Sequence, residues 1–304
     1  MHDFPVEIWL KIINDIGKQH PSAYRLGPGG PNVLARLCRL NSTFRLLSEP
    51  ILYSAVYITP ENLEAFTRMV LGQGKSAPLE FVPSVKGHLV KRLAIAEFEK
   101  RLKDEEIECI GTILYALRSV ITHLLFDVNL PYIDWVQPIC SNNHAAICYA
   151  MRELSSLEEF CTFDGFRLWH KLQRNSPWPR LRRLAFTKAE NRSSIKEKIQ
   201  WTCTLETCVM FADFQGPLVV TTDPADHSLA SETLKRMVIV CPKNRAKDYI
   251  SDVDLWFARS RRPDRDPTIN QCLKVVELPD TPDVLRETTM HFRSAVIDGK
   301  IWDM

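Results

Sequence analysis

The sequence predicts an α/β fold that begins with helices and then alternates short strands with helical segments. Three observations support this prediction. An amphipathic helical pattern opens the chain, two short helices follow a loop, and beyond residue 83 apolar strands recur with helical segments between them. A unit of one strand and one returning helix cannot bury its own apolar face, so such units stack. We therefore expect an open, curved α/β solenoid, with a compact α/β domain built on a parallel sheet as the alternative.

The first segment of the chain has the spacing of an amphipathic helix. Pro5 suits the first helical turn, where its missing N–H is not needed, and Glu7 favours the positive end of the helix dipole. Apolar side chains then recur on one side of the helix, at Ile8, Trp9, Ile12, Ile13 and Ile16. This apolar face must be covered, either by a partner or by the rest of the chain.

The next segment completes a recognisable order of elements. Residues 17–32 contain a Gly-Pro-Gly-Gly-Pro run, which predicts a loop, and residues 33–58 read as two short helices that run into a strand. The opening Phe-Pro-x-Glu-Ile, the stretch at 37–44 and the Glu-Pro-Ile-Leu-Tyr-x-x-Val ending at 49–56 together resemble the F-box family. The resemblance covers roughly the first fifth of the chain.

The F-box resemblance implies a three-helix module that docks on the Skp-type linker subunit of a cullin-RING ubiquitin ligase. A module of this size buries only a modest share of its apolar side chains within itself. The family's docking positions fall on Phe4, Pro5, Ile8, Leu37, Leu40, Phe44 and Leu52. The alternative is that these residues form an N-terminal helical cap packed on the rest of the protein.

The remainder of the chain divides into a short helical linker and a long repetitive region. We assign residues 1–58 to an F-box-like docking module, 59–89 to a helical linker and 90–304 to a substrate-recognition domain. In the linker, Thr59 caps a helix over residues 61–70, Pro60 takes its first position and Gly72 follows its end. Later helices are expected over residues 104–120 and 132–151.

The long region contains about seven short apolar strands that share a leading Leu-x-x-Leu character. They fall at residues 90–95, 121–126, 157–161, 181–186, 205–210, 234–239 and 273–278. The second apolar anchor of each strand is Leu93, Leu124, Phe160, Leu184, Cys208, Met237 and Val276. The spacing is irregular, and the array resembles a degenerate leucine-rich repeat. A final helix begins after a Thr-Pro-Asp cap at 281–283, carries Val284, Leu285, Met290 and Phe292, and leads through Gly299 to an apolar plug at Ile301 and Trp302.

Composition bounds the function classes that the chain fits. With 304 residues, 45% hydrophobic and 25% charged, the chain is typical of a globular protein, and its net charge of +2 gives no general attraction to nucleic acid. It contains no apolar stretch long enough to span a bilayer and no signal peptide at its start. We expect a cytoplasmic or nuclear protein with no membrane partner. Nine cysteines without Cys-x-x-Cys pairs indicate reduced thiols, so the sequons at Asn41 and Asn191 are expected to be silent.

Two short patterns resemble binding motifs but fail on context. Gly-Lys-Ser at residues 74–76 ends like a phosphate-binding loop, yet Met69 replaces the required first glycine and Pro78 interrupts the following helix. Cys140, His144 and Cys148 lie four residues apart, with Cys161 as the nearest fourth candidate ligand, but three ligands do not make a structural zinc site. We predict no metal site and no cofactor.

The candidate surface for a target protein rests on residues that follow the strands. Four aspartates come near strand ends, either as an acidic rim for a basic partner or, the favoured interpretation, as turn and cap residues: Asp127, Asp164, Asp213 and Asp280. Nearby aromatics are either binding anchors or core, with core favoured: Phe163, Phe166, Trp169, Phe211 and Phe214. If they bind, Phe163, Phe166, Trp169 and Phe214 are the candidates for target contact.

The functional expectation is a non-catalytic substrate receptor of a Skp-cullin-F-box ubiquitin ligase. The N-terminal helices would hold the linker subunit, and the repeat region would hold an unidentified target protein. The first alternative is a repeat-type interaction scaffold outside any ligase. A distant hydrolase or transferase is the second, but the sequence carries no catalytic motif and no polar constellation at its predicted strand ends.

Overall fold

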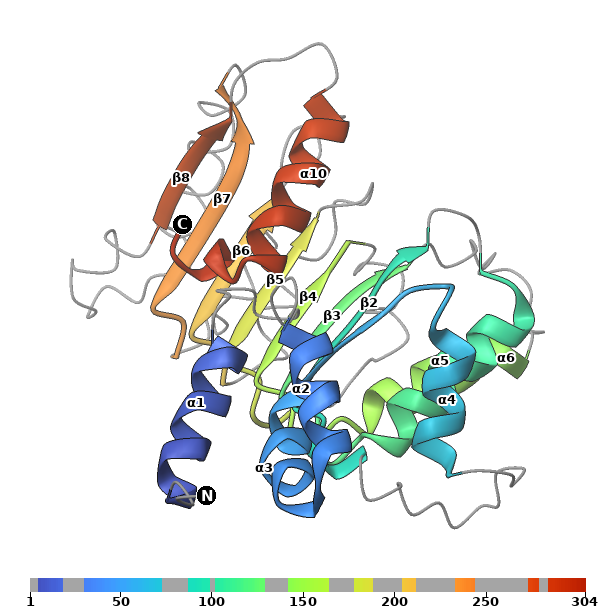
Figure 1. The fold of residues 1–304 in the computed structure, drawn as a ribbon. Coiled ribbons are helices and arrows are strands. Elements are labelled where there is room, and N and C mark those ends of the chain that lie inside the picture. Colours follow the sequence, from blue (N-terminus) through green and yellow to red (C-terminus); the bar gives the residue numbers. More distant parts are fainter. Residues whose placement is uncertain are drawn as a thin grey trace.

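The computed structural model describes residues 5–18, 30–72, 87–98, 102–128, 142–163, 178–187, 204–211, 233–243, 273–278 and 284–304. In these ranges the chain is a mixed α/β protein with an open sheet of eight strands, all parallel and ordered as in the sequence (Figure 1). The strands are β1 (Ala55–Ile58), β2 (Arg92–Phe98), β3 (His123–Val128), β4 (Glu159–Thr162), β5 (Arg183–Thr187), β6 (Thr207–Phe211), β7 (Arg236–Pro242) and β8 (Leu273–Leu278).

The entries to strands β2 to β7 repeat one backbone arrangement. The carbonyl of Ser54 accepts N–H groups from both Lys91 and Arg92, at 3.1 and 2.9 Å. The same double acceptance recurs from each unit to the next as far as β7, through the carbonyls of Lys91, Thr122, Glu158, Arg182 and Glu206. Six of the seven predicted strands start two residues later than predicted. The leading apolar residue of each lies in the turn before the strand and not in the strand itself. That residue is still buried, as at Ile121, Leu157 and Leu181.

The strand register confirms six of the seven predicted anchors. Leu93 pairs with Leu124, and the row continues through Phe160, Leu184, Cys208 and Met237. The last anchor is wrong: Met237 pairs with Leu273, and Val276 pairs with Val240 instead. The reason is that β8 begins directly at Leu273, whereas the earlier leading residues lie in the turn before their strands. The row also starts one strand earlier than predicted for the repetitive region, at Val56 of β1.

Helices cover one face of the sheet along its first half. They are α4 (Leu63–Leu71), α5 (Asp104–Ala116) and α6 (Asn142–Arg152), and they lie on the same side of the strands in Figure 1. The helix predicted over residues 104–120 is α5, which ends at Ala116, and its Ile107, Ile110 and Ile113 are all buried against this face. Glu106 accepts a hydrogen bond from the Lys103 N–H, which fixes the start of α5.

The start of α4 corrects the prediction made from Thr59 and Pro60. The helix begins at Leu63 with Asn62 in the cap position, because residues 60–62 form a turn in which the Thr59 carbonyl accepts the N–H groups of Asn62 and Leu63. Asn62 stabilises that turn by accepting the Thr59 N–H and donating to the Tyr57 carbonyl. Gly72 ends the helix as predicted, with a positive φ of 72° that favours glycine.

The opposite face is covered by the C-terminal segment. α10 (Val284–Ile297) and the short 3-10 helix η5 (Lys300–Trp302) lie over the later strands, and Gly299 turns the chain between them with φ 74°. Phe292, Val296 and Ile301 are buried there together with sheet residues such as Val209 and Val238. Of the apolar residues predicted on this helix, Phe292 is buried and Met290 is 56% exposed. The side chains of Val284 and Leu285 and the cap at 281–283 lie outside the described residues.

Three helices precede the sheet and have a core of their own. They are α1 (Val6–Lys18), α2 (Gly30–Leu40) and α3 (Ser42–Leu52). α2 begins inside the run that was predicted to exclude a helix, because a proline is tolerated in the first turn, where Pro31 lies. The side chains of Ile13 and Leu34 are fully buried, yet no residue before Val56 belongs to either described core of the sheet.

Candidate interaction surfaces

The N-terminal helices carry most of the exposed large apolar side chains that the structure describes. Seven of nine lie on α1, α2 and α3, a concentration that random surface exposure would not give. They are Val6, Ile8, Leu10, Ile12, Val33, Leu40 and Leu46; the other two are Tyr149 and Met290. We refer to these seven residues as the N-terminal apolar surface.

The helix α1 shows how apolar residues come to be exposed. Ile13 is buried and Trp9 half-buried, so this strip of the helix faces α2 and α3. Ile8 and Ile12, which the sequence places on the same apolar face, are each 43% exposed beside it. The apolar face of α1 is wider than its contact with α2 and α3, so the apolar residues at the edges of that face lie in water. Their exposure costs free energy unless another surface covers them.

Local hydrogen bonds and ring packing hold the three helices together. Trp9 packs edge-to-face on Phe44, with ring centroids 4.9 Å apart, and so joins α1 to α3. Asn41 caps α3 by accepting the Phe44 N–H at 2.8 Å. Arg45 donates from Nε to the Cys38 carbonyl at 3.1 Å and joins α3 to α2.

The residues predicted to bind a linker subunit fall into three groups. Pro5, Ile8 and Leu40 are exposed. Leu37, Phe44 and Leu52 are half-buried, and Phe44 is already engaged by Trp9. Phe4 lies outside the described residues.

The aromatic residues predicted to contact a target are only partly described. Phe163 is half-buried and packs edge-to-face on Phe292 at 4.5 Å, and Phe211 is a core residue that packs on Phe292 at the same distance. Phe166, Trp169 and Phe214 lie outside the described residues. The one candidate that is described therefore touches the C-terminal helix of its own chain.

Asp127 corrects both interpretations of the post-strand aspartates. It lies inside β3, is buried, and accepts two hydrogen bonds from Arg293 of α10, at 2.7 and 3.1 Å. Burial raises the pKa of Asp127, and the hydrogen bond and charge of Arg293 oppose that shift only in part. It is neither an exposed rim residue nor a turn residue. Asp164, Asp213 and Asp280 lie outside the described residues.

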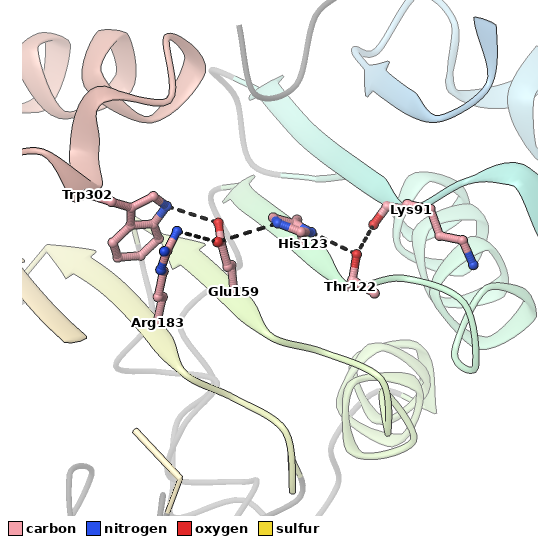
Figure 2. A network of polar contacts seen from close by, with 6 residues as sticks. All are labelled: Lys91, Thr122, His123, Glu159, Arg183 and Trp302. Carbon is pink, nitrogen blue, oxygen red and sulfur yellow. Dashed lines mark hydrogen bonds and ion pairs between the residues drawn. The ribbon is translucent and has the colours of Figure 1, made fainter. Parts of the chain in front are cut away.

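Sequence reasoning missed a second polar cluster, shown in Figure 2, where the strands begin. Glu159 of β4 accepts hydrogen bonds from Arg183 of β5 at 2.8 Å and from the Trp302 indole at 3.0 Å, and His123 of β3 approaches it at 3.4 Å. Burial by itself would raise the pKa of Glu159, but the hydrogen bond and charge of His123 and the charge of Arg183 outweigh it and lower that pKa.

A signal for this cluster was present in the sequence. The first residue of successive strands is polar or charged, at Arg92, His123, Glu159, Arg183, Thr207 and Arg236, and these residues pair with one another in register. Alternation along a strand puts them all on one face, the face that α10 covers. Only the register, which the sequence does not supply, shows that they are neighbours.

The cluster has a hydroxyl, an imidazole and a carboxylate in order, which is the order of a nucleophilic triad. The Thr122 hydroxyl lies 2.8 Å from His123 Nδ1 and donates to the Lys91 carbonyl at 3.1 Å. A hydroxyl that donates to a carbonyl is not activated by the imidazole, and the carboxylate is already held by Arg183 and Trp302. The geometry therefore fits a structural network that ties β3, β4 and β5 to the C-terminal segment.

The described residues do not support the cysteine-histidine pattern at 140–148 or the Gly-Lys-Ser loop as binding sites. Cys148 lies on α6 and is buried in the core on that side of the sheet, whereas Cys161 is buried in the core on the opposite side, under α10. The prediction of Cys161 as a fourth ligand beside Cys148 is therefore wrong. Cys140 and the His144 side chain lie outside the described part. Within that part no cluster of three or more histidine, cysteine, aspartate or glutamate side chains is placed to hold a metal ion. Of the loop at 72–76, only Gly72 is described, as the end of α4.

Comparisons with known proteins add no family assignment. No protein-family model matches this sequence. A search of curated proteins gives no significant match. Among the helices that the structure describes, none combines the length and the apolar character needed to cross a bilayer.

Proposed function

We propose that this protein is a non-catalytic substrate-receptor subunit of a Skp-cullin-F-box ubiquitin ligase. The observation that carries the proposal is the N-terminal apolar surface, because three helices with their own core and an exposed apolar exterior need a partner. The F-box resemblance of the same helices, whose docking positions include Ile8 and Leu40 of this surface, names that partner as a Skp-type linker. The cytosol or the nucleus is the compartment in which we expect the complex.

The connection between the helices and the sheet supports the role of a bridge. α3 ends at Leu52, and β1 begins at Ala55 after a tight turn in which Ser54 donates from its hydroxyl to the Ile51 carbonyl. The Ser54 carbonyl in turn accepts both N–H groups from the start of β2. A short, hydrogen-bonded connection of this kind holds a docking module in a fixed orientation to the sheet.

The sheet region supports the second half of the proposal, which is the holding of a target protein. Eight strands in sequence order, with the same carbonyl arrangement at six successive junctions, are what stacked repeat units produce. We infer that this is an irregular leucine-rich-repeat-like array. Such a receptor acts by proximity, since it raises the local concentration of target lysines near a conjugating enzyme and needs no catalytic residue of its own.

Co-purification with a Skp-type linker tests the proposal. We expect the wild-type chain to bind, and Ile8→Asp and Leu40→Asp each to weaken binding by about thirtyfold or more, the size of an interface hot spot. Met290→Asp is the matched control, because it makes the same change at an exposed apolar side chain on α10. It should bind like wild type.

Two outcomes would contradict different parts of the proposal. A folded wild-type chain that does not bind the linker would refute the ligase role and favour the alternative, an interaction scaffold outside any ligase. Linker binding that survives both Ile8→Asp and Leu40→Asp would leave the ligase role standing but show that the docking site is assigned to the wrong residues.

A further inference from the structure

The C-terminal segment lies across one face of the sheet and contacts strands far from it in sequence. We call residues 284–304, which contain α10 and η5, the C-terminal cover. Arg293 binds Asp127 of β3, Trp302 binds Glu159 of β4, and the Trp302 carbonyl accepts a hydrogen bond from Arg236 of β7 at 2.6 Å. Figure 1 shows α10 over the later strands, and Figure 2 shows Trp302 reaching the start of β4.

In the part of the chain that the structure describes, the C-terminal cover is attached to the sheet through side chains, apart from the one Trp302 carbonyl. In the described residues, the backbone hydrogen bonds of the cover outside α10 are internal, from Asp298 to Ser294, from Gly299 to Val296 and from Asp303 to Lys300. The strands satisfy one another through their own ladders, and the opposite face has a separate apolar core. Lifting the cover therefore breaks none of the backbone hydrogen bonds that the described strands make with one another.

The polar contacts under the cover are specific, but the ion pair itself adds little net free energy. Arg293 is 45% exposed while Asp127 is buried, and the loss of water around a buried carboxylate offsets much of its attraction to a base. Burial raises the pKa of Asp127, because the charged carboxylate is less stable under the cover than in water. Rehydration of Asp127 offsets part of the free energy of opening.

The main apolar contact under the cover is made by one aromatic side chain packed against two others. Phe292 is fully buried with its ring 4.5 Å from both Phe163 and Phe211, edge-to-face to each. The next residue, Arg293, reaches the buried carboxylate of Asp127. The face thus recognises an aromatic side chain followed directly by a base, and here the chain itself supplies both.

We propose that the C-terminal cover is displaceable and that the face beneath it binds a peptide segment carrying an aromatic residue followed by a basic residue. The inference rests on the proposed function only in assigning that segment to a ligase target. The opening of the cover and the binding of the peptide do not depend on the linker subunit. A failure here would leave linker co-purification unchanged, and a failure of linker binding would leave this site intact.

Native-state hydrogen exchange on the full chain tests the opening. We expect the amides of α10 to exchange at least about tenfold faster than those of β3 to β6, through an opening that leaves the strands protected. Exchange of α10 together with the strands, at the same rate, would show that the cover is an integral part of the fold and would overturn the proposal.

Binding in trans tests the site. The probe is a labelled synthetic peptide of residues 284–304, and its control is the same peptide with alanine at the positions of Phe292 and Arg293. The full chain carrying Phe292→Ala and Arg293→Ala should bind the probe at least about tenfold more tightly than wild type, because its own cover no longer competes. The control peptide should bind neither chain.

Each result of the binding experiment either supports or overturns the proposed binding face. Tighter binding of the probe by the double variant supports the site. Equal or absent binding by a variant whose strand amides stay protected overturns it. Loss of strand protection in the double variant also overturns it, since a displaceable cover would leave the sheet folded.

Discussion

The N-terminal helices and the sheet region differ in how far their apolar side chains are buried. In the described residues the sheet has a buried core on both faces, one under α4, α5 and α6 along its first half and the other under α10, whereas the three helices bury few side chains and leave seven large apolar ones exposed. Both regions have apolar patterns in the sequence. The comparison teaches that a pattern shows which side chains avoid water, and only the structure shows which of them lack a cover.

The largest effect on stability should come from the middle of the sheet. Leu124 is fully buried between Leu93 and Phe160 in the anchor row. Leu124→Ala should lower the free energy of unfolding by about 2–5 kcal/mol, because it leaves a cavity in a packed core. Urea unfolding measures this. A loss below about 1 kcal/mol would mean that the row does not organise the core.

A smaller, local effect should follow from a change inside the helical region. Trp9→Ala removes the edge-to-face contact with Phe44 and should destabilise α1 to α3 by about 1–3 kcal/mol, since Trp9 is only half-buried. Hydrogen exchange should quicken in these helices and stay unchanged in the strands. Equal loss of protection in both regions would break the comparison, because it would show a single cooperative unit.

The network at Glu159 should give a still smaller effect that depends on pH. The pKa of this carboxyl is lowered from 4.5 in the folded chain, so its stabilisation is present above that pH and is lost as the pH falls through the folded value. Glu159→Gln should cost about 1–2 kcal/mol at pH 7 and remove this dependence. Unfolding midpoints from pH 7 to pH 3 measure both. An unchanged acid dependence in the variant would show that other carboxyls account for it.

The smallest effect on stability should come from the exposed apolar residues. Leu46 is 74% exposed on α3, so Leu46→Asp should change the free energy of unfolding by no more than about 0.5 kcal/mol. Thermal unfolding of the variant checks this. A clear loss of stability would show that Leu46 packs on part of the chain and does not belong to the N-terminal apolar surface.

Much of the fold could be predicted from the sequence because local patterns determine it. The helix at Ile107, Ile110 and Ile113, the turn at Gly299 and six anchors of the strand row follow from spacing and residue type. The strand starts were placed two residues early, because an apolar residue buried in a turn looks the same in sequence as one in a strand. The role of Asp127 could not be predicted, since its partner Arg293 is 166 positions away.

The candidate surfaces were predictable to different degrees. An amphipathic helix reveals that α1 has an apolar face, but the sequence alone does not separate buried Ile13 from exposed Ile8 and Ile12. That difference depends on where α2 and α3 are packed. The cluster at Glu159 depends on strand register and on the path of the C-terminal segment, and neither is a local property.

The repeated strand entry has a consequence for how this chain tolerates changes in length. Successive anchors are 24 residues apart between Leu184 and Cys208 but 37 apart between Val56 and Leu93, yet at all six junctions from β1 to β7 one carbonyl accepts two N–H groups from the next unit. The hydrogen-bonded junction between neighbouring units is the same throughout these strands, whereas the chain segments between the junctions differ in length. The length of chain between strands can therefore vary while these hydrogen-bonded junctions stay the same, so new surface can be added without redesigning the sheet.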